Sequence, residues 1–522
     1  MMDSAGALHR GTLAARALWL LPFALLLPGV VGLPLFDVDE GAFASATREM
    51  LASGDWLSTT LNGVPRFDKP IFIYWLQAIS VSIFGFHEWS VRLPSVLAAS
   101  AWCVLVAHFA RARLPAGVAE VVLVVSATSL GVMIIGRAAT ADALLNLLIA
   151  AACLDGYRHL AEGDRSALRR AYVWVALGLL TKGPIAVLVP CAALGLFALS
   201  AGHWRRGLRA AFDPLGWMLL VAIALPWYAA ALVIHGQAFI DGFIMKHNVE
   251  RAMSPLHGHR GFTGYQFATT LLLLLPWTPA LIGAFAGMRS DFADPLKRFL
   301  WLWFLFVLMF FTVVSTKLPH YVLYGATPLF LLVALKAVQW ARGPVWQRLL
   351  LVVPPLLLIA LLPLVPMLVA AQAAGMRRPH ARVMLERAAE VAAIQQYVQF
   401  GVAFAVAAGV VAVLLWRRTL LAAGALALLL GVALVTMVAP YVGELLQGPT
   451  RRAAAIAAAQ DAPAVLWHFP APTFSAYLGR PTPSRAPQPG ELAFTRLGQV
   501  PPEWRVEVLL SEGGVELVRV LP

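Results

Sequence analysis

Apolar runs of about bilayer length recur along this chain and constrain its fold more than any other feature. A helix needs about 20 predominantly apolar residues to cross the hydrocarbon core of a membrane, and residues 349–371 and 420–440 are two clear runs of this kind. Charged residues make up 13% of the 522, whereas soluble domains carry about 25%. Because many such runs are present, we predict an all-α polytopic membrane protein.

The apolar runs define about thirteen predicted spans. They cover residues 15–35, 90–110, 116–136, 139–157, 171–181, 183–201, 215–234, 265–287, 299–315, 320–341, 349–371, 399–416 and 419–440. The first run is long enough to span and lacks a convincing small-residue cleavage site, so we interpret it as an uncleaved helix. Gly183-Pro184 is expected to break the pair of runs around Lys182.

The basic residues orient this map. With the N-terminus inside, lysine or arginine lies in every predicted inside loop, as the positive-inside rule requires. These loops account for much of the net charge of +13. A nucleic-acid-binding face would interleave aromatic and basic residues, and the sequence lacks this pattern. No nucleic acid partner is therefore predicted. One outside segment, 372–398, breaks the rule. Either its arginines bind lipid phosphates or the map is wrong there: Arg377, Arg378, Arg382 and Arg387.

Three regions follow from the map. Residues 1–345 form the predicted core, with 36–88 as its first outside loop, and residues 346–440 add further membrane helices. Residues 441–522 form a small module outside the membrane. From Asp461 onward, short apolar or alternating stretches are separated by proline-rich turns, a pattern typical of strands. We expect an α/β or β module there, with strand pairing left open.

Loop 36–88 contains the charged residues that indicate chemistry. Three carboxylates, Asp37, Asp39 and Glu40, follow directly after a span. An ionisable residue at the edge of a membrane bundle is a functional hypothesis by default, although acidic residues also favour a solvated helix N-terminus. Lys69 precedes a proline and the apolar-aromatic run 71–76. On its own, such a lysine would be interpreted as an interfacial anchor.

The motifs of this loop resemble those of a known family. The loop reads Asp39-Glu40, Arg48-Glu49-Met50, Gly54-Asp55-Trp56 and Lys69-Pro70. In this it resembles the first periplasmic loop of the lipid A aminoarabinose transferases and, more broadly, the protein O-mannosyltransferase-like proteins with the GT-C fold. Weaker similarities follow in "GRAATADALL", "GLLTKGPIAVLVP", "HNVER" and "STKLPHYVLYGATPLF". The resemblance covers roughly residues 15–345.

The resemblance implies a role for each matching position. Asp39 is the expected general base, with Glu40 beside it as the alternative and Lys69 as a further member of the catalytic set. The donor phosphate is expected to contact Lys69, Lys182, Arg251, Tyr321 and Arg66. No cofactor is required by this scheme, but some relatives bind a divalent metal ion where this chain has Asp68 and His247, with His257 or His259 as a further ligand.

The sequence departs from the family pattern at two positions. Ala42 stands where the aminoarabinose transferases have an arginine, and Arg66 stands where they usually have an aromatic residue. We interpret this exchange as a move of one cation to the other side of the phosphate pocket. It affects the identity of the sugar more than the type of reaction.

The predicted function is therefore transfer of a sugar from a polyprenyl-phosphate donor, such as one on undecaprenyl phosphate, to lipid A, another envelope glycan or a protein. A single displacement would invert the anomeric centre. The expected location is the bacterial inner membrane, with the site on the periplasmic side. A transporter or flippase is the main alternative, because Asp142 and Lys182 are intramembrane charges. A non-catalytic assembly subunit would be expected to lose Asp39 and Lys69.

Overall fold

A computed structural model describes residues 17–250, 262 and 264–522 of the chain, and most of these residues are helical. Among the described residues, seven helical segments have the length and apolar composition needed to cross a membrane: Glu88–Arg113, Pro214–His235, Pro295–Val313, Pro319–Ala341, Val345–Gly375, Tyr397–Leu415 and Thr419–Ala458. The chain is thus a multi-pass, mostly α-helical membrane protein, as predicted. The larger number of spans stays a prediction.

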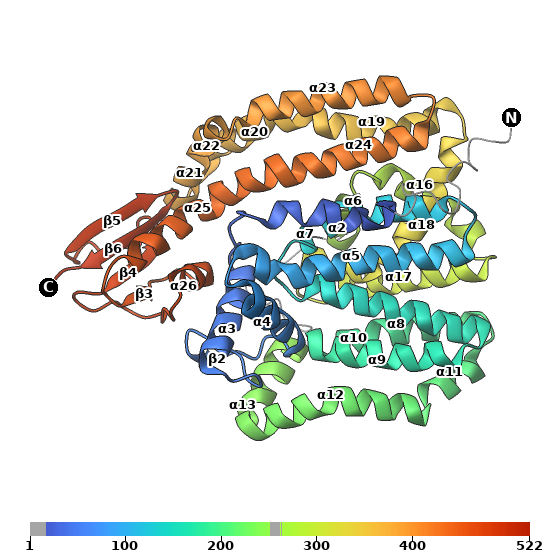
Figure 1. Cartoon of the computed structure of the whole chain (residues 1–522), viewed down its shortest axis with the longest axis horizontal. Helices are drawn as coiled ribbons and strands as arrows, with labels where there is room; N and C mark the ends of the chain where they lie inside the picture. The colour runs from blue at the N-terminus through green and yellow to red at the C-terminus, as the bar shows by residue number, and fades with distance from the viewer. Residues whose placement is uncertain (1–16, 251–261, 263) are drawn as a thin grey trace.

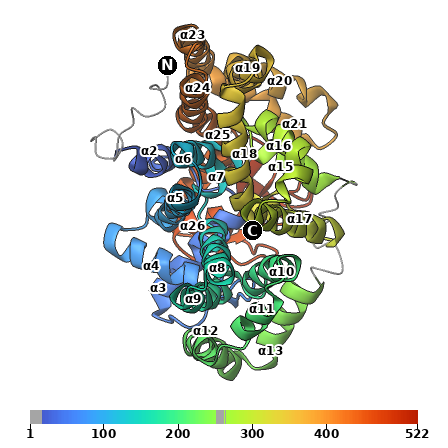
Figure 2. The same ribbon diagram turned by 90° about the vertical axis from the view of Figure 1, so that its right-hand side faces the viewer.

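The helices lie side by side in one bundle, seen from the side in Figure 1 and along the helices in Figure 2. Its main members are α2 (Leu21–Leu26), α5 (Glu88–Arg113), α6 (Val118–Thr128), α7 (Leu130–Ile135), α8 (Asp142–Glu162), α9 (Arg165–Lys182), α10 (Ile185–Ser200), α12 (Pro214–His235), α17 (Pro295–Val313), α18 (Ala326–Ala341), α19 (Val345–Leu361), α23 (Tyr397–Leu415) and α24 (Thr419–Ala433). Bulky apolar side chains such as Trp102, Trp301 and Phe330 are buried between them.

Glycine and proline interrupt the predicted spans. Helix α9 ends at Lys182, Gly183 has a φ of +81° and α10 begins after Pro184, which confirms the predicted break. The predicted span 265–287 is also divided, into α15 (Tyr265–Leu273) and α16 (Thr278–Asp291), on either side of Pro276. A proline lacks an N–H group and its ring clashes with the preceding turn, which favours a break at Pro276.

The first loop folds at one end of the bundle (Figure 1). It contains α3 (Asp39–Ser53), a hairpin of β1 (Thr60–Leu61) and β2 (Val64–Pro65), and α4 (Phe72–Phe84). Asn62 and Gly63 turn the hairpin with positive φ, as a tight two-residue hairpin turn requires. The Glu49 carboxylate of α3 accepts hydrogen bonds from the backbone N–H groups of Asn62 (2.6 Å) and Gly63 (3.1 Å).

The C-terminal module is a small α/β unit, as predicted. Helix α25 (Ala439–Ala458) runs past residue 441, where the sequence placed the start of the module, and the first strand begins at Ala464. The sheet order is β3-β4-β6-β5, in which β3 and β4 are parallel and the other pairs are antiparallel. These strands are β3 (Ala464–Leu466), β4 (Leu492–Arg496), β5 (Val506–Glu512) and β6 (Val515–Val520), and α26 (Pro472–Leu478) lies between β3 and β4 in the chain.

The arginine-rich segment 372–398 lies beside this module (Figure 1). It forms the short helices α21 (Pro379–Glu386) and α22 (Ala388–Ile394). Arg387 pairs with Glu512 of β5 at 2.6 Å, and Arg382 pairs with Glu386 at 2.8 Å. Local carboxylates therefore compensate part of the positive charge that breaks the orientation rule. The contact with lipid phosphates stays a prediction.

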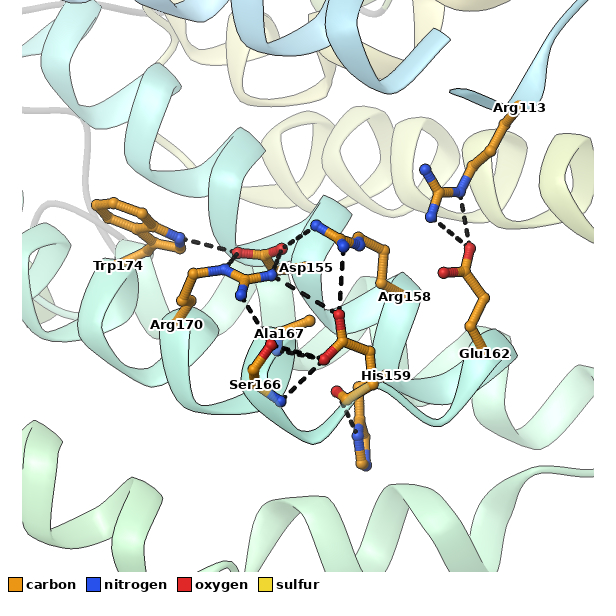
Figure 3. Close-up of polar contacts among 10 residues, drawn as sticks. Arg113, Asp155, Arg158, His159, Glu162, Ser166, Ala167, Arg170 and Trp174 are labelled. Carbon is orange, nitrogen blue, oxygen red and sulfur yellow. Dashed lines mark hydrogen bonds and ion pairs between the residues drawn. The ribbon is translucent and has the colours of Figure 1, made fainter. Parts of the chain in front are cut away.

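Ion pairs join α8 and α9 at the other end of the bundle (Figure 3). The Asp155 carboxylate accepts from Arg170 at 2.9 Å and from the Trp174 indole N–H at 3.1 Å. Asp164 caps α9 by accepting from the backbone N–H of Ala167 at 3.0 Å. In this predicted inside turn, Arg158 and Arg170 are thus paired with neighbouring carboxylates.

The two ends of the bundle give a test of orientation. Arg209 lies on α11 (Trp204–Ala211) and Arg377 in the segment beside the C-terminal module, and both are exposed. In a background without Cys191, an exposed cysteine, Arg377→Cys should react with a membrane-impermeant maleimide in spheroplasts, and Arg209→Cys only in inverted vesicles. Labelling of Arg209→Cys in intact spheroplasts would contradict the orientation.

Candidate active site

A cavity of about 230 Å³ lies between the first loop and the membrane helices. It is lined by Asp68, Lys69, Lys182, Pro184, Ile185, Leu188, Phe243, His247, Phe310, Phe311, Val314, Tyr321 and Tyr324. The lining combines two kinds of side chain: charged and hydroxyl groups from the loop, α9 and the 3-10 segment η5 (Pro319–Gly325), and apolar groups from α10 and α17. Five residues predicted from the resemblance meet here, namely Lys69, Lys182, Tyr321, Asp68 and His247.

Lys182 is held at the broken end of α9 by polar neighbours. Its ammonium group donates to the Asp142 carboxylate at 2.5 Å and to the Tyr324 hydroxyl at 2.9 Å. His320 Nε2 lies 3.7 Å from the same carboxylate, and the Lys182 Nζ atom is 5.7 Å from the centre of the Tyr321 ring. The resemblance indicated Lys182 and Tyr321 as ligands of the donor phosphate. The sequence indicated Asp142 only as an intramembrane charge that would suit a transporter. It did not indicate His320 or Tyr324, although both lie in the motif "STKLPHYVLYGATPLF".

Asp68 is engaged through both of its oxygen atoms. Oδ1 lies 2.6 Å from Nε2 of His247, which belongs to the π-helical segment η3 (Ile240–Glu250), and Oδ2 lies 2.9 Å from Arg66. Burial on its own would raise the pKa of Asp68, but the hydrogen bond with His247 and the charges of Arg66 and Lys69 hold that pKa well below its usual range. Asp68 is therefore ionised and fixed in position.

The two residues of the predicted metal pair contact each other, with Nε2 of His247 2.6 Å from Oδ1 of Asp68. Across residues 17–250, 262 and 264–522, no group of three or more His, Cys, Asp or Glu side chains could hold a metal ion. Asp68 and His247 contact each other directly, and the further predicted ligands His257 and His259 lie outside the described residues. The described side chains alone do not form a metal site.

Asp39 lies outside the cavity lining, exposed at the first position of α3. Its side chain makes no hydrogen bond with any residue that the structure describes. Its charge acts on Arg66: burial lowers the pKa of Arg66, but Tyr74, Asp68 and Asp39 raise it, and the net shift is upward. Arg66 links Asp39 electrostatically to Asp68 at the cavity. Arg66 also lines a smaller pocket together with Lys69.

Glu40 is held in structural contacts, and its place in the catalytic set stays a prediction. Its side chain is buried, and its two oxygens accept a bidentate pair of hydrogen bonds from Arg92 of α5 at 2.8 and 2.7 Å. They also accept from the backbone N–H groups of Phe36 and Ala139, at 2.9 and 2.6 Å. These four hydrogen bonds engage both oxygens of Glu40, so Asp39 is the more accessible of the two carboxylates. Arg251, the remaining predicted phosphate ligand, lies outside the described residues.

The bundle, the folded first loop and the lysines at an apolar cavity define the class of the protein: its fold is that of the GT-C membrane proteins. The chain superposes on the crystal structure of ArnT from Cupriavidus metallidurans bound to undecaprenyl phosphate with a TM-score of 0.80, at 20% identity, over 98% of each chain. The apo structure of the same protein gives a TM-score of 0.77 at 20% identity, over 97% of this chain and 98% of that one.

Sequence comparison points to the same group. Residues 68–230 match a family model described as dolichyl-phosphate-mannose-protein mannosyltransferase. The chain is 30% identical over 333 residues to the undecaprenyl phosphate-alpha-4-amino-4-deoxy-L-arabinose arabinosyl transferase of Edwardsiella ictaluri (strain 93-146), covering 62% of this chain and 59% of the relative. The protein of the same name from Yersinia pestis (strain Pestoides F) is 31% identical over 318 residues, or 59% and 56% of the two chains. The chain thus matches somewhat under three fifths of these relatives' length, and the resemblance seen in the first loop is confirmed.

The pairing of Glu40 with Arg92 predicts a stability effect. Glu40→Gln should lower the free energy of unfolding by about 3–5 kcal/mol, because it leaves a buried guanidinium without its counter-charge. Glu162→Gln is a matched control, since Glu162 also pairs with an arginine, Arg113, but is 44% exposed; an exposed pair contributes about 0–1 kcal/mol. Thermal melting in detergent measures both, and equal melting points for the two variants would contradict the assignment.

Proposed function

We propose that the protein transfers a sugar from a polyprenyl-phosphate donor, with undecaprenyl phosphate as the carrier, to lipid A or another envelope acceptor. The site would face the periplasm at the bacterial inner membrane. The observation that carries the proposal is the cavity, which joins two lysines to apolar walls. The names of the similar proteins support the same substrate class. Because the match covers only part of these relatives, the whole activity is a proposal.

The lining suits both parts of such a donor. Ile185, Leu188 and Phe310 offer an apolar surface to isoprenoid carbons, whose removal from water is favourable. Lys69 and Lys182 lie where the phosphate would sit. As the bond between the anomeric carbon and the phosphate oxygen breaks, the leaving phosphate gains negative charge, and positioned cations in a low-dielectric site stabilise that charge in the transition state.

Asp39 is the proposed general base. As the acceptor oxygen attacks the anomeric carbon, its proton passes to the Asp39 carboxylate and the polyprenyl phosphate leaves. One carboxylate is enough for this step, and a single displacement inverts the anomeric centre. Exposure of Asp39 at the start of α3 leaves its oxygens accessible to an acceptor. No step of this scheme passes through a metal ion.

The transfer itself can be tested with the purified protein in liposomes. Undecaprenyl-phosphate-linked 4-amino-4-deoxyarabinose and lipid A are supplied, and mass spectrometry follows the modified lipid A. We expect Lys69→Ala to raise the KM for the donor and to lower kcat, because one phosphate contact and one transition-state charge are lost. Lys246→Ala is the matched control, since Lys246 is exposed on η3 and does not line the cavity.

Two results would argue against this function. Movement of the donor lipid across the bilayer without any covalent product would favour the transporter alternative. Equal donor KM values for Lys69→Ala and Lys246→Ala would remove the cavity from donor binding. A parallel assay with chelator, followed by added Mg²⁺ or Mn²⁺, tests the predicted metal contribution of Asp68 and His247.

Asp39→Asn should lower kcat by roughly 10²–10⁴-fold, the range typical of general-base catalysis. The KM for the donor should stay near the wild-type value, because the proposed phosphate contacts are lysines and not Asp39. Asp461→Asn, which alters an exposed carboxylate just before β3, is the control and should transfer at the wild-type rate. A folded Asp39→Asn protein with wild-type kcat would overturn the role of Asp39.

A further inference from the structure

The C-terminal module is bonded to the residues that precede α3, although more than 400 positions of sequence separate them. Asp37 stands two residues before Asp39, and one of its carboxylate oxygens accepts from the backbone N–H of Thr473, in α26, at 2.9 Å. The other oxygen accepts from the hydroxyl group of the same threonine. Burial raises the pKa of Asp37 from 3.8 to about 6, although these two hydrogen bonds lower it. The carboxylate is thus held inside the contact between module and loop.

A second contact lies on the other side of Asp39. Gly41 packs directly against α26: a Cβ atom at this position would lie 2.4 Å from the Thr473 nitrogen and 2.8 Å from the Pro472 carbonyl carbon. Both neighbours are backbone atoms, which cannot move away as the end of a flexible side chain can. One turn further along α3, the Ser45 hydroxyl donates to the Pro472 carbonyl at 2.9 Å.

Other bonds complete the attachment. The Tyr477 hydroxyl accepts from the backbone N–H of Leu35 at 2.7 Å, and Asn62 in the β1–β2 hairpin accepts from the backbone N–H of Thr482 at 3.0 Å. The module therefore contacts the loop before α3, along α3 and in the hairpin after it. Asp39 lies between the two closest contacts, while its own side chain makes no hydrogen bond with the described residues.

We propose that α26 of the C-terminal module positions the general base, through the bond between Thr473 and Asp37 and the packing of Thr473 on Gly41. Thr473 is then a positioning residue, and the module is part of the catalytic apparatus. The inference rests on the proposed function, because it requires Asp39 to act as the base. A displacement of about 1 Å in a reacting group can reduce a rate by about 10²-fold, so a small shift at the start of α3 is expected to be visible in kcat.

The test is a set of threonine variants measured in the liposome assay. Thr473→Val keeps the branched shape and removes the hydroxyl group, and we expect kcat to fall by about 10-fold or more with little change in donor KM. Thr473→Ser should restore most of the rate because it restores the hydroxyl group. Thr495→Val is the matched control: Thr495 is also buried in the module, but its hydroxyl donates to Trp467 at 2.8 Å within the module. Its kcat should match the wild type.

A double variant separates positioning from general stability. If Thr473 acts only through Asp39, adding Thr473→Val to Asp39→Asn should cause no further loss of kcat, because residues that act as a unit are not additive. A further fall equal to that in the wild-type background would overturn the inference and assign Thr473 a structural role. Gly41→Ala gives an independent arm and should lower kcat even if Thr473→Val folds poorly.

These experiments also distinguish the positioning role of Thr473 from the proposed role of Asp39, on which it rests. Loss of transfer in Asp39→Asn with wild-type kcat in both Thr473→Val and Gly41→Ala would overturn the positioning role and leave the proposed base intact. Wild-type transfer in Asp39→Asn would overturn the base, and the positioning inference with it.

Discussion

The buried ion pair between Glu40 and Arg92 joins the first loop to the membrane bundle. Arg92 belongs to a long apolar helix, and its guanidinium also donates to the carbonyl groups of Leu33 and Pro34. Glu40 in turn accepts from the backbone of Ala139, three residues before Asp142. Burying two charges is costly unless hydrogen bonds satisfy them, and here the bidentate geometry and the backbone groups do so. One interaction therefore fixes the start of α3, the end of the first membrane segment and the turn before α8.

This connection explains why the ionisable groups meet at one level of the bundle. Asp142 begins α8 just after the turn held by Glu40, and Lys182 ends α9 where Gly183 and Pro184 interrupt the helix. Both charges therefore lie at helix ends, where the chain leaves the apolar interior. Lys69 reaches the same level from the loop. Cations at the border between apolar walls and the loop suit a phosphate whose lipid chain extends into the membrane.

Local patterns were enough to predict the helical class, the break after Lys182 and a small C-terminal module with strands, because each depends on neighbours in sequence. The resemblance named Lys69, Lys182 and Tyr321 as ligands of the donor phosphate; the three line one cavity, and their role stays a prediction. The role of Glu40 could not be predicted, because its partner Arg92 lies 52 positions away in an apparently ordinary span. The same holds for Thr473, whose contact with Asp37 crosses 436 positions. Acidic residues next to each other in sequence acquire different roles only when the fold supplies their partners.

The structure shows the surroundings of Ala42 and Arg66, the two positions that depart from the family pattern. Ala42 is 1% exposed, so a long cationic side chain has no room at this position of α3. Arg66 approaches the same helix, with its guanidinium 5.6 Å from the centre of the Phe43 ring. Its pairing with Asp68 neutralises part of its charge, which an arginine without such a partner would keep. The surroundings of Asp39 are therefore less positive than a simple exchange of arginine positions implies.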